Sequence, residues 1–351
     1  MIRRVILALT VVAGTCAGAQ ELTERIGATT AAQELRVRST TDLDVLRPVL
    51  ERFLDTRPGT AILYEQWLSN NLYRRSVTEC EAGTPGADLV ISSAVHQLVE
   101  FVNRACAASH VSEATARLPP RLSWRDELWG ITREPAVIVY NRDLVPPEEV
   151  PRSRFDLLDI LRNAPDRYAG RIATYDIEAS GLGFLFAYAD SLEATTFGGL
   201  LEAFGRTGAV ATCCSAEIMA GVLNGDYLIA YNILGSYAFD LAEENPDLGI
   251  VAPSDYTLIL ARGAVVPRGA RNYMMATQLV DFLVSTGTQD TLRRANLHID
   301  LDALLEKGAV PDGTGASQLR AIELSPKLLV ALDRHKRLLF KEVWQNAFSQ
   351  D

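Results

Sequence analysis

The chain alternates short apolar runs with longer stretches of helical spacing. In its first third, apolar runs at residues 35–38, 61–64 and 87–91 predict strands, and helical patterns follow at about 43–53, 70–82 and 95–104. The first of these helices repeats apolar side chains at Leu43, Leu46, Leu50 and Phe53, which indicates one buried face. Strands that alternate with helices in this way are typical of an α/β fold with parallel strands.

The middle of the chain repeats this pattern. Apolar runs at 136–140, 171–175 and 227–231 predict strands, and helical spacing at 155–163, 184–192 and 215–222 separates them. We therefore expect two α/β lobes, which suits a chain of 351 residues. Lobe 1 would comprise residues 31–132 plus 256–351, and lobe 2 residues 133–255. The crossovers between the lobes would lie near 131–135 and 248–253, and residues 258–266 would form a strand of lobe 1.

Hydroxyl-bearing residues recur where predicted strands give way to helices. In open α/β sheets ligands bind at the carboxyl ends of the strands, and a helix start adds unpaired N–H groups that favour anions. Each such junction alone equally fits an ordinary helix cap, but their recurrence in both lobes favours ligand contact. The candidate residues are Ser39, Thr40, Thr41, Ser92, Ser93, Ser180, Gly181 and Ser215.

Five further polar residues are candidates for ligand contact. Tyr231 and Asn232 end a predicted strand, although an aromatic side chain there also fits core packing. Arg133 and Glu134 lie at the expected crossover, where a guanidinium can clamp an anion or pair with the other lobe. Asp176 can accept from ligand hydroxyl groups or cap the next helix.

The first 19 residues have the pattern of a secretory signal. Arg3 and Arg4 precede an apolar run at 5–13 and a small-residue exit at 17–19, which predicts cleavage before Gln20. A lipoprotein signal with Cys16 as the lipidated residue is the alternative, and Thr15 is a poor neighbour for that processing. Signal cleavage implies export to the periplasm.

Charge and cysteine content narrow the partners. Loss of the two leader arginines changes the formal charge from -10 to -12, because 32 basic residues then face 44 acidic ones, and this acidity argues against nucleic acid. In an oxidising compartment Cys80 and Cys106 are a plausible disulfide, although four cysteines allow three pairings. The adjacent Cys213 and Cys214 fit two small buried side chains or a vicinal disulfide better than a redox role.

Catalytic and metal-binding motifs are missing from the sequence. The four histidines stand in no metal-ligand spacing, and neither an HExxH nor a GxSxG motif occurs. We expect no enzyme activity, no metal and no cofactor.

The order of these elements resembles the iron(III) and organic-anion branch of the periplasmic solute-binding proteins of ABC transporters. Five segments carry the resemblance: 35–42, 88–93, 134–141, Ser180-Gly181 and 225–232. It implies a type II periplasmic-binding-protein fold with two crossover hinge strands. It also implies a monomer that delivers a small molecule to a membrane permease or a sensor kinase.

This chain differs from the iron-binding members of that branch at one place. Those members bind iron with two adjacent tyrosines shortly after the strand that here ends in Tyr231, and this chain has residues 233–236 (ILGS) there. Other members bind sugar phosphates, phosphoglycerate or aminoalkylphosphonates. We therefore expect a small anionic ligand, phosphorylated or phosphonylated, with ferric iron as the alternative.

Overall fold

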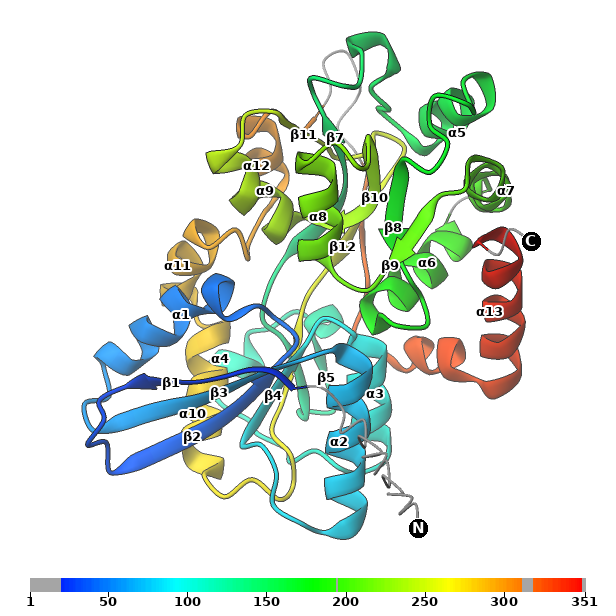
Figure 1. The fold of residues 1–351 in the computed structure, drawn as a ribbon. Coiled ribbons are helices and arrows are strands. Elements are labelled where there is room, and N and C mark those ends of the chain that lie inside the picture. The colour runs from blue at the N-terminus through cyan, green and yellow to red at the C-terminus, as the bar shows by residue number, and fades with distance from the viewer. Residues whose placement is uncertain (1–19, 194, 311–317, 349–351) are drawn as a thin grey trace, which may run out of the picture.

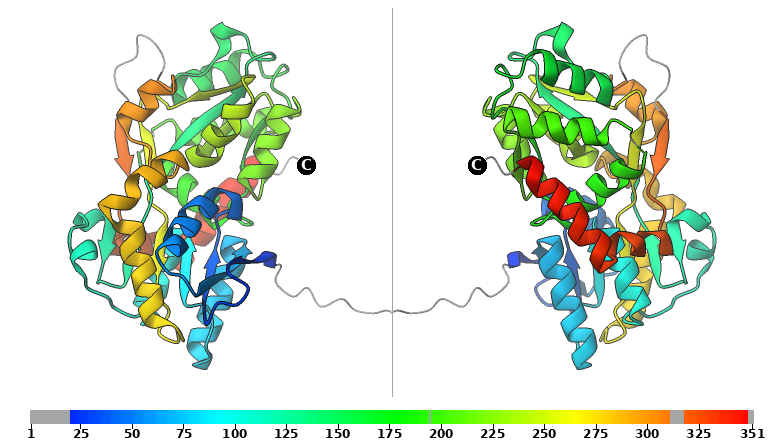
Figure 2. Two further views of the ribbon diagram at one scale, coloured as in Figure 1. Left: turned by 90° about the vertical axis from the view of Figure 1, so that its left-hand side faces the viewer. Right: turned by 90° about the vertical axis from the view of Figure 1, so that its right-hand side faces the viewer.

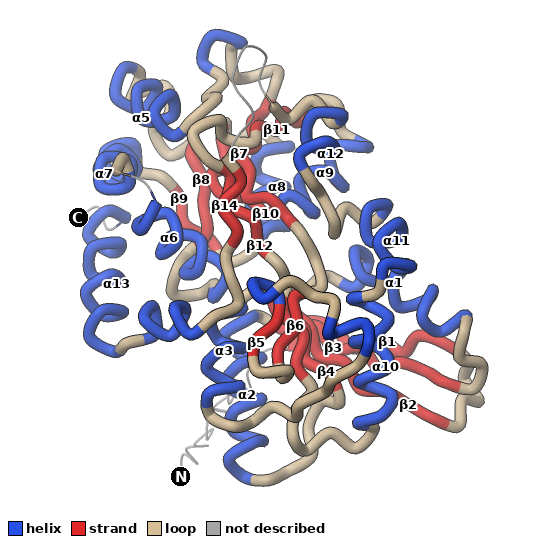
Figure 3. The backbone as a smooth tube through the Cα atoms, turned by 180° about the vertical axis from the view of Figure 1, so that it is seen from behind, coloured by secondary structure: helices blue, strands red, loops and turns tan. Residues whose placement is uncertain are grey.

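The computed structural model describes residues 20–193, 195–310 and 318–348. Two β-sheets, each flanked by helices, lie one above the other, and they are seen from two opposite sides in Figures 1 and 3. We call the lower sheet with its helices lobe 1 and the upper one lobe 2. The expected signal peptide, residues 1–19, lies outside the described residues.

Lobe 1 has a seven-stranded sheet in the order β1-β3-β2-β4-β13-β6-β5. Its centre is parallel, since β2 pairs in parallel with β3 and with β4, and the strands at both ends are antiparallel. The strands are β1 (Gln20–Gly27), β2 (Gln33–Ser39), β3 (Thr60–Trp67), β4 (Leu89–Ser92), β5 (Ser123–Trp124), β6 (Leu128–Gly130) and β13 (Gly263–Val265). The helices are α1 (Leu43–Asp55), α2 (Ser69–Ala82), α3 (Val95–Asn103), α4 (Glu113–Ala116), η1 (Pro120–Leu122), α10 (Tyr273–Val284), η3 (Thr286–Thr288) and α11 (Gln289–Arg294).

Lobe 2 has a second seven-stranded sheet, ordered β14-β12-β7-β10-β8-β9, with β11 paired to β7. The strands are β7 (Glu134–Asn141), β8 (Ile172–Tyr175), β9 (Val210–Thr212), β10 (Ile229–Leu234), β11 (Leu248–Val251), β12 (Thr257–Leu260) and β14 (Leu319–Ala321). The helices are η2 (Pro147–Glu149), α5 (Arg154–Asn163), α6 (Gly181–Glu193), α7 (Phe197–Thr207), α8 (Ser215–Leu223), α9 (Gly235–Glu244), α12 (Leu301–Glu306) and α13 (Arg334–Phe348). A 3-10 helix, η4 (Pro326–Leu332), joins β14 to α13.

The apolar face of α1 is buried in the core of lobe 1, as the sequence predicts. Leu43, Leu46, Leu50 and Phe53 of α1 are each at most 2% exposed and pack in one cluster with the strands below them. Fully burying such side chains contributes roughly 1.5–3 kcal/mol each. Cys80 at the end of α2 is joined by a disulfide to Cys106 after α3, with a Cα–Cα distance of 5.7 Å.

The chain crosses between the lobes at residues 131–133, as expected, but the return crossing lies elsewhere. We expected it near 248–253, yet β11 in that range pairs antiparallel with β7 inside lobe 2. The return lies at Ala261 and Arg262, between β12 of lobe 2 and β13 of lobe 1. Residues 258–266, which we expected to form one strand of lobe 1, therefore belong to two strands in two sheets, β12 and β13, and the buried Arg262 lies between them.

The C-terminal segment touches both lobes. β14 extends the sheet of lobe 2, η4 lies against α3 of lobe 1, and α13 packs on α7 of lobe 2. The view at the right of Figure 2 shows α13 running along the side of the molecule. We had expected this whole segment in lobe 1. Within the described residues, no helix is long and apolar enough to cross a bilayer.

Candidate functional site

A cavity of about 260 Å³ lies between the two lobes, and we call it the interlobe cleft. Both lobes and the return crossover supply its walls. Lobe 1 contributes Glu21, Thr40, Asp42, Gln66, Trp67, Leu68, Ser69 and Ser93. Lobe 2 contributes Tyr175, Ala179, Ser180, Leu182, Cys213, Cys214, Ser215, Ala216, Leu234 and Tyr237, and the crossover contributes Arg262.

Six helices begin at the interlobe cleft. The lining residues at these starts are Asp42 before α1, Leu68 and Ser69 at α2, Ser93 before α3, Ser180 before α6, Cys214 and Ser215 at α8, and Leu234 before α9. At α1, α2, α3, α8 and α9 the side chain at the N-cap position makes no capping hydrogen bond. Helix starts carry a partial positive charge and unpaired N–H groups, so the walls of the cleft favour a negatively charged group.

The start of α8 presents free backbone N–H groups at the cleft. The N–H groups of Ser215 and Ala216 have no acceptor among the residues that the structure describes. The Ser215 hydroxyl lies 2.7 Å from the Tyr175 hydroxyl, which fixes it at the rim of the cleft. Across the cleft, the Thr40 and Ser93 hydroxyl oxygens are 3.2 Å apart, and Thr40 accepts from the Ser93 N–H. These groups leave hydroxyl donors available to a bound molecule.

The two lobes touch beside the interlobe cleft. The Gly181 N–H donates to the Ser69 hydroxyl over 2.8 Å, and the Asn70 amide donates to the Glu178 carbonyl over 2.8 Å. A Cβ at Gly181 would lie 2.8 Å from the Gln97 amide nitrogen of lobe 1. Close approach of the lobes at α6 therefore requires glycine here.

A buried ion pair stands behind the cleft at the crossovers. The Arg262 guanidinium donates to both carboxylate oxygens of Glu134, at 2.9 and 3.1 Å, and neither side chain is more than 1% exposed. Arg262 also donates to the Thr41 hydroxyl at 2.7 Å, and the Thr132 hydroxyl donates to Glu134 at 2.6 Å. We call Thr41, Thr132, Glu134 and Arg262 the hinge network. It ties lobe 1 to both crossover strands.

The predicted site residues do not all lie at one place. Thr40, Ser93, Ser180 and Ser215 line the interlobe cleft, and Gly181 forms the lobe contact beside it. Thr41 and Glu134 belong to the hinge network, while Arg133 lines a different cavity. Ser39, Ser92 and Asp176 accept from backbone N–H groups two residues further on, as ordinary caps of turns.

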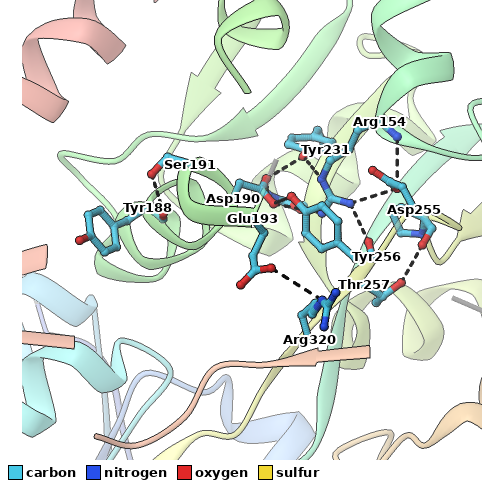
Figure 4. Close-up of polar contacts among 12 residues, drawn as sticks. Arg154, Tyr188, Asp190, Ser191, Glu193, Tyr231, Asp255, Tyr256, Thr257 and Arg320 are labelled. Atoms are coloured by element: carbon cyan, nitrogen blue, oxygen red, sulfur yellow. Dashed lines mark hydrogen bonds and ion pairs between the residues drawn. The ribbon is translucent and has the colours of Figure 1, made fainter. Parts of the chain in front are cut away.

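Tyr231 points into the interior of lobe 2 (Figure 4), and the buried Asn232 amide donates to the same carboxylate, Asp190, that Tyr231 contacts. The Tyr231 hydroxyl donates to Asp190 at 2.6 Å and accepts from Arg154 at 2.7 Å, and the Tyr256 hydroxyl donates to Asp190 at 2.7 Å. Arg154 and Asp190 form an ion pair at 3.1 Å with at most 1% of either side chain exposed. Burial raises the pKa of Tyr231, so its phenol stays protonated and serves this network.

Three parts of the cleft were not predicted from the sequence. Arg262 sits inside an apolar run, and that single charge was its only signal. Trp67 ends a strand and carries no local signal of a site, whereas Tyr237, which lines the cleft, was a candidate for ligand contact in the sequence. Cys213 and Cys214 form a vicinal disulfide, one of the two structural alternatives for this pair, and both line the cleft.

A cleft between two α/β lobes, bordered by helix starts and backed by two crossovers, defines a two-lobed ligand-binding receptor of type II architecture. The family model for bacterial extracellular solute-binding proteins matches residues 84–312. The chain belongs to this family, whose members act as solute-binding receptors of ABC transporters.

Solved structures agree with this assignment. The substrate-binding protein of an ABC transporter from Agrobacterium tumefaciens is 33% identical, with 93% of this chain and 98% of that chain covered and a TM-score of 0.85. Iron-bound HitA from Pseudomonas aeruginosa is 19% identical, with 90% and 99% covered and a TM-score of 0.63. AfuA from Actinobacillus pleuropneumoniae, solved with fructose-6-phosphate, is 14% identical, with 90% and 99% covered and a TM-score of 0.67. The last two share the fold alone, and no curated protein matches this chain.

Proposed function

We propose that the chain is exported to the periplasm and captures a small anionic organic molecule in the interlobe cleft, without catalysis. A phosphorylated or phosphonylated compound is the preferred ligand class, and an ABC permease or a sensor kinase is the receiving partner. The convergence of six helix starts on one cavity carries the proposal, because aligned N–H groups bind phosphate-like oxygens without a metal.

The hydroxyl groups at the cleft support the same ligand class. Thr40, Ser93 and Ser215 supply neutral donors, while the charge of Arg262 is already balanced by Glu134. An anion would thus be held mainly by backbone N–H groups and hydroxyls, which is how a dry site binds an oxyanion without an unpaired cation.

Two carboxylates that line the interlobe cleft suggest which other polar groups the ligand carries. Gln66 donates to Asp42 at 2.7 Å and to Glu21 at 3.2 Å, and all three side chains line the cleft. Burial raises the pKa of Asp42, and Arg262 opposes that rise. Carboxylates here would accept from hydroxyl or amine groups, so the ligand is expected to carry both an acid group and polar donors.

Ferric iron receives less support. Iron(III) favours anionic oxygen ligands, and Tyr231 and Tyr237 are the tyrosines in β10 and in the first turn of α9 that could supply phenolates. Tyr231 belongs to the interior network of lobe 2, and burial raises the pKa of Tyr237, whose oxygen accepts from the Asp42 N–H at 3.2 Å. Tyr231 and Tyr237 therefore do not face a common position at the cleft.

A thermal-shift screen of the full mature chain tests the proposal. Sugar phosphates, aminoalkylphosphonates, simple carboxylates and ferric citrate form its four arms. A ligand present at 1,000 times its dissociation constant stabilises the folded state by about 4 kcal/mol. A shift with a phosphate or phosphonate is expected. A shift with ferric citrate alone, accompanied by a tyrosinate-to-iron absorption band, would reject the proposal in favour of iron.

Matched variants then place the ligand. Thr40→Ala removes a hydroxyl from the cleft, and Thr78→Ala removes one from an exposed position of α2, where it bonds only within the helix. Loss of a hydrogen bond to a charged ligand costs about 1.5–3 kcal/mol, so Thr40→Ala should weaken binding at least tenfold. Thr78→Ala should leave affinity unchanged. Equal affinities of both variants would argue against binding in the cleft.

A further inference from the structure

A second cavity, of about 270 Å³, lies on the other side of the crossovers from the interlobe cleft, and we call it the hinge cavity. The crossover residues Ile131, Thr132, Arg133 and Ala261 line it, whereas the next residue, Arg262, lines the cleft. Its remaining walls come from α4 to η1, from the end of α10 through α11, and from β14. In the view from behind, β5 and β6 of lobe 1 lie below β12 and β14 of lobe 2 (Figure 3).

The hinge cavity has a strongly one-sided charge. Its lining residues include three arginines, Arg117, Arg121 and Arg133, and no aspartate or glutamate, although the whole chain carries a net charge of -10. His298 also lines it, and burial together with the nearby Arg293 and Arg133 lowers the pKa of this imidazole, so it is neutral at pH 7 and can donate one N–H. Arg117 is paired with Glu113 at the surface. Within the described ranges, the side chains of Arg121, Arg133 and His298 have neither an ion-pair partner nor a hydrogen-bond acceptor.

Arg133 is the centre of this charge. Its Nε is buried and has no acceptor among the described residues. An unpaired buried donor costs about 1–3 kcal/mol, more when it is charged, so this position favours an anionic acceptor. The backbone of Arg133 is fixed on both sides, since its N–H donates to the Leu297 carbonyl and its carbonyl accepts from Ile299, each at 2.8 Å. The backbone of Arg133 is thereby held beside His298.

The other walls of the hinge cavity are apolar. Hydrocarbon side chains from η1, β12, α10, α11 and two loop positions face the same space as the arginines. They are Leu118, Leu122, Ile259, Leu283, Leu292 and Ile322. Small-molecule sites combine such apolar walls with a few polar groups that fix orientation. The combination suits a molecule with one acid group and an apolar body.

We propose that the hinge cavity is a second ligand site, which binds a small carboxylate with an aromatic or aliphatic body. The carboxylate is held by Arg133, with Arg121 and His298 beside it, and the hydrocarbon part lies against the apolar wall. This site is distinct in space from the one proposed for a phosphate-type ligand in the interlobe cleft, because the two cavities share no lining residue.

The two sites are coupled through the hinge network. The Thr132 hydroxyl accepts from the Arg262 N–H at 2.8 Å and donates to Glu134, so a wall of the hinge cavity is bonded to the residue that lines the cleft. Hinge closure changes the angle between the crossovers. A molecule held against both crossovers therefore alters the affinity of the cleft, and linkage requires the reverse effect to be equal.

The probe for this proposal is 4-iodobenzoate, tested on the full mature chain by calorimetry and by crystal soaking with iodine anomalous scattering. One molecule per chain is expected, with its iodine peak in the hinge cavity. 4-Iodobenzamidine, which has the same body and a positive charge, should not bind there. Iodine peaks found only in the interlobe cleft or on the surface would overturn the proposal.

Variants provide the second readout. Arg133→Gln should weaken 4-iodobenzoate binding at least tenfold, and Arg121→Gln, at an exposed position, should weaken it about threefold. Arg162→Gln is the control, since Arg162 lies on α5 of lobe 2 and pairs with Glu202 at the surface. Unchanged affinity in both Arg133→Gln and Arg121→Gln would refute the assignment, whatever the melting temperature of either variant.

Discussion

Replacement of Asp190 by alanine should be among the most destabilising single changes in lobe 2. This carboxylate accepts from four donors: the Arg154 guanidinium, the Tyr231 hydroxyl, the Asn232 amide and the Tyr256 hydroxyl. All four donors are buried, three of them can be followed in Figure 4 (Arg154, Tyr231 and Tyr256), and Asp190 is 1% exposed. The substitution leaves a buried guanidinium with less compensating charge and three neutral donors without their acceptor.

The expected loss follows from those contacts. Removal of one partner of a buried ion pair costs about 3–5 kcal/mol, and Arg154 keeps partial compensation from Asp255 at 3.3 Å and from the Tyr256 carbonyl at 2.6 Å. We therefore expect Asp190→Ala to lower the free energy of unfolding by about 4 kcal/mol. Asp190→Asn, which keeps one acceptor oxygen and the volume, should cost about half as much.

Calorimetric melting and urea titration measure these losses. A loss of 4 kcal/mol corresponds to a fall in Tm of roughly 10 °C for a lobe of this size. The control is Asp290→Ala, which removes a carboxylate that is 79% exposed and paired with Arg293 at 2.9 Å; surface pairs of this kind contribute less than about 1 kcal/mol. If Asp190→Ala loses less than 1 kcal/mol, the network is not a dry, charge-balanced core element and the reasoning fails.

Three other predictions concern the lobe contact, acid stability and the disulfide. Gly181→Ala should force the lobes apart and weaken ligand binding roughly tenfold, with a larger radius of gyration by X-ray scattering, whereas Gly198→Ala, with no neighbour within 4 Å, should change neither. Burial lowers the pKa of His96 to about 3, so between pH 6.5 and pH 3 the unfolded chain binds a proton that the folded chain does not. The free energy of unfolding should therefore be unaffected above pH 6.5 and fall by about 2–3 kcal/mol by pH 4.5. The same decrease of stability with pH in His96→Phe would exclude His96 as the cause. Joint replacement of Cys80 and Cys106 by alanine opens a link across 26 positions and should cost about 3–4 kcal/mol in chemical denaturation, and no loss would mean that the thiols are unpaired in solution.

Local periodicity was enough to predict the architecture. The apolar repeat of α1 and the strand-to-helix junctions at Thr40, Ser93, Ser180 and Ser215 depend on residues close in sequence, so their side chains could be assigned to a face or an edge in advance. The carboxyl-end rule for open sheets then directed attention to the edge at which the interlobe cleft lies.

Long-range pairings were the part that could not be predicted. Tyr231 stands at a strand end as a ligand residue would, and only its partners from α5 and α6 show that it faces the interior. Arg262 breaks an apolar run, but its partner Glu134 lies 128 positions away, and nothing local distinguishes a crossover from a strand interior. Ser39 and Ser92 each precede a cleft hydroxyl by one residue, and the strand alternation turns them inward.

The segment from β14 to α13 leaves lobe 2, rests η4 against α3 of lobe 1, and returns to α7 of lobe 2. Besides the crossovers, it is a further mechanical link between the halves. For the entrance to widen, η4 must detach from α3 or the turn into α13 must bend. Opening of the lobes to admit a ligand thus has a free-energy cost that is determined in part by contacts far from the binding surface. Truncation before η4 would remove those contacts, and the lobes of the shortened protein would open more easily.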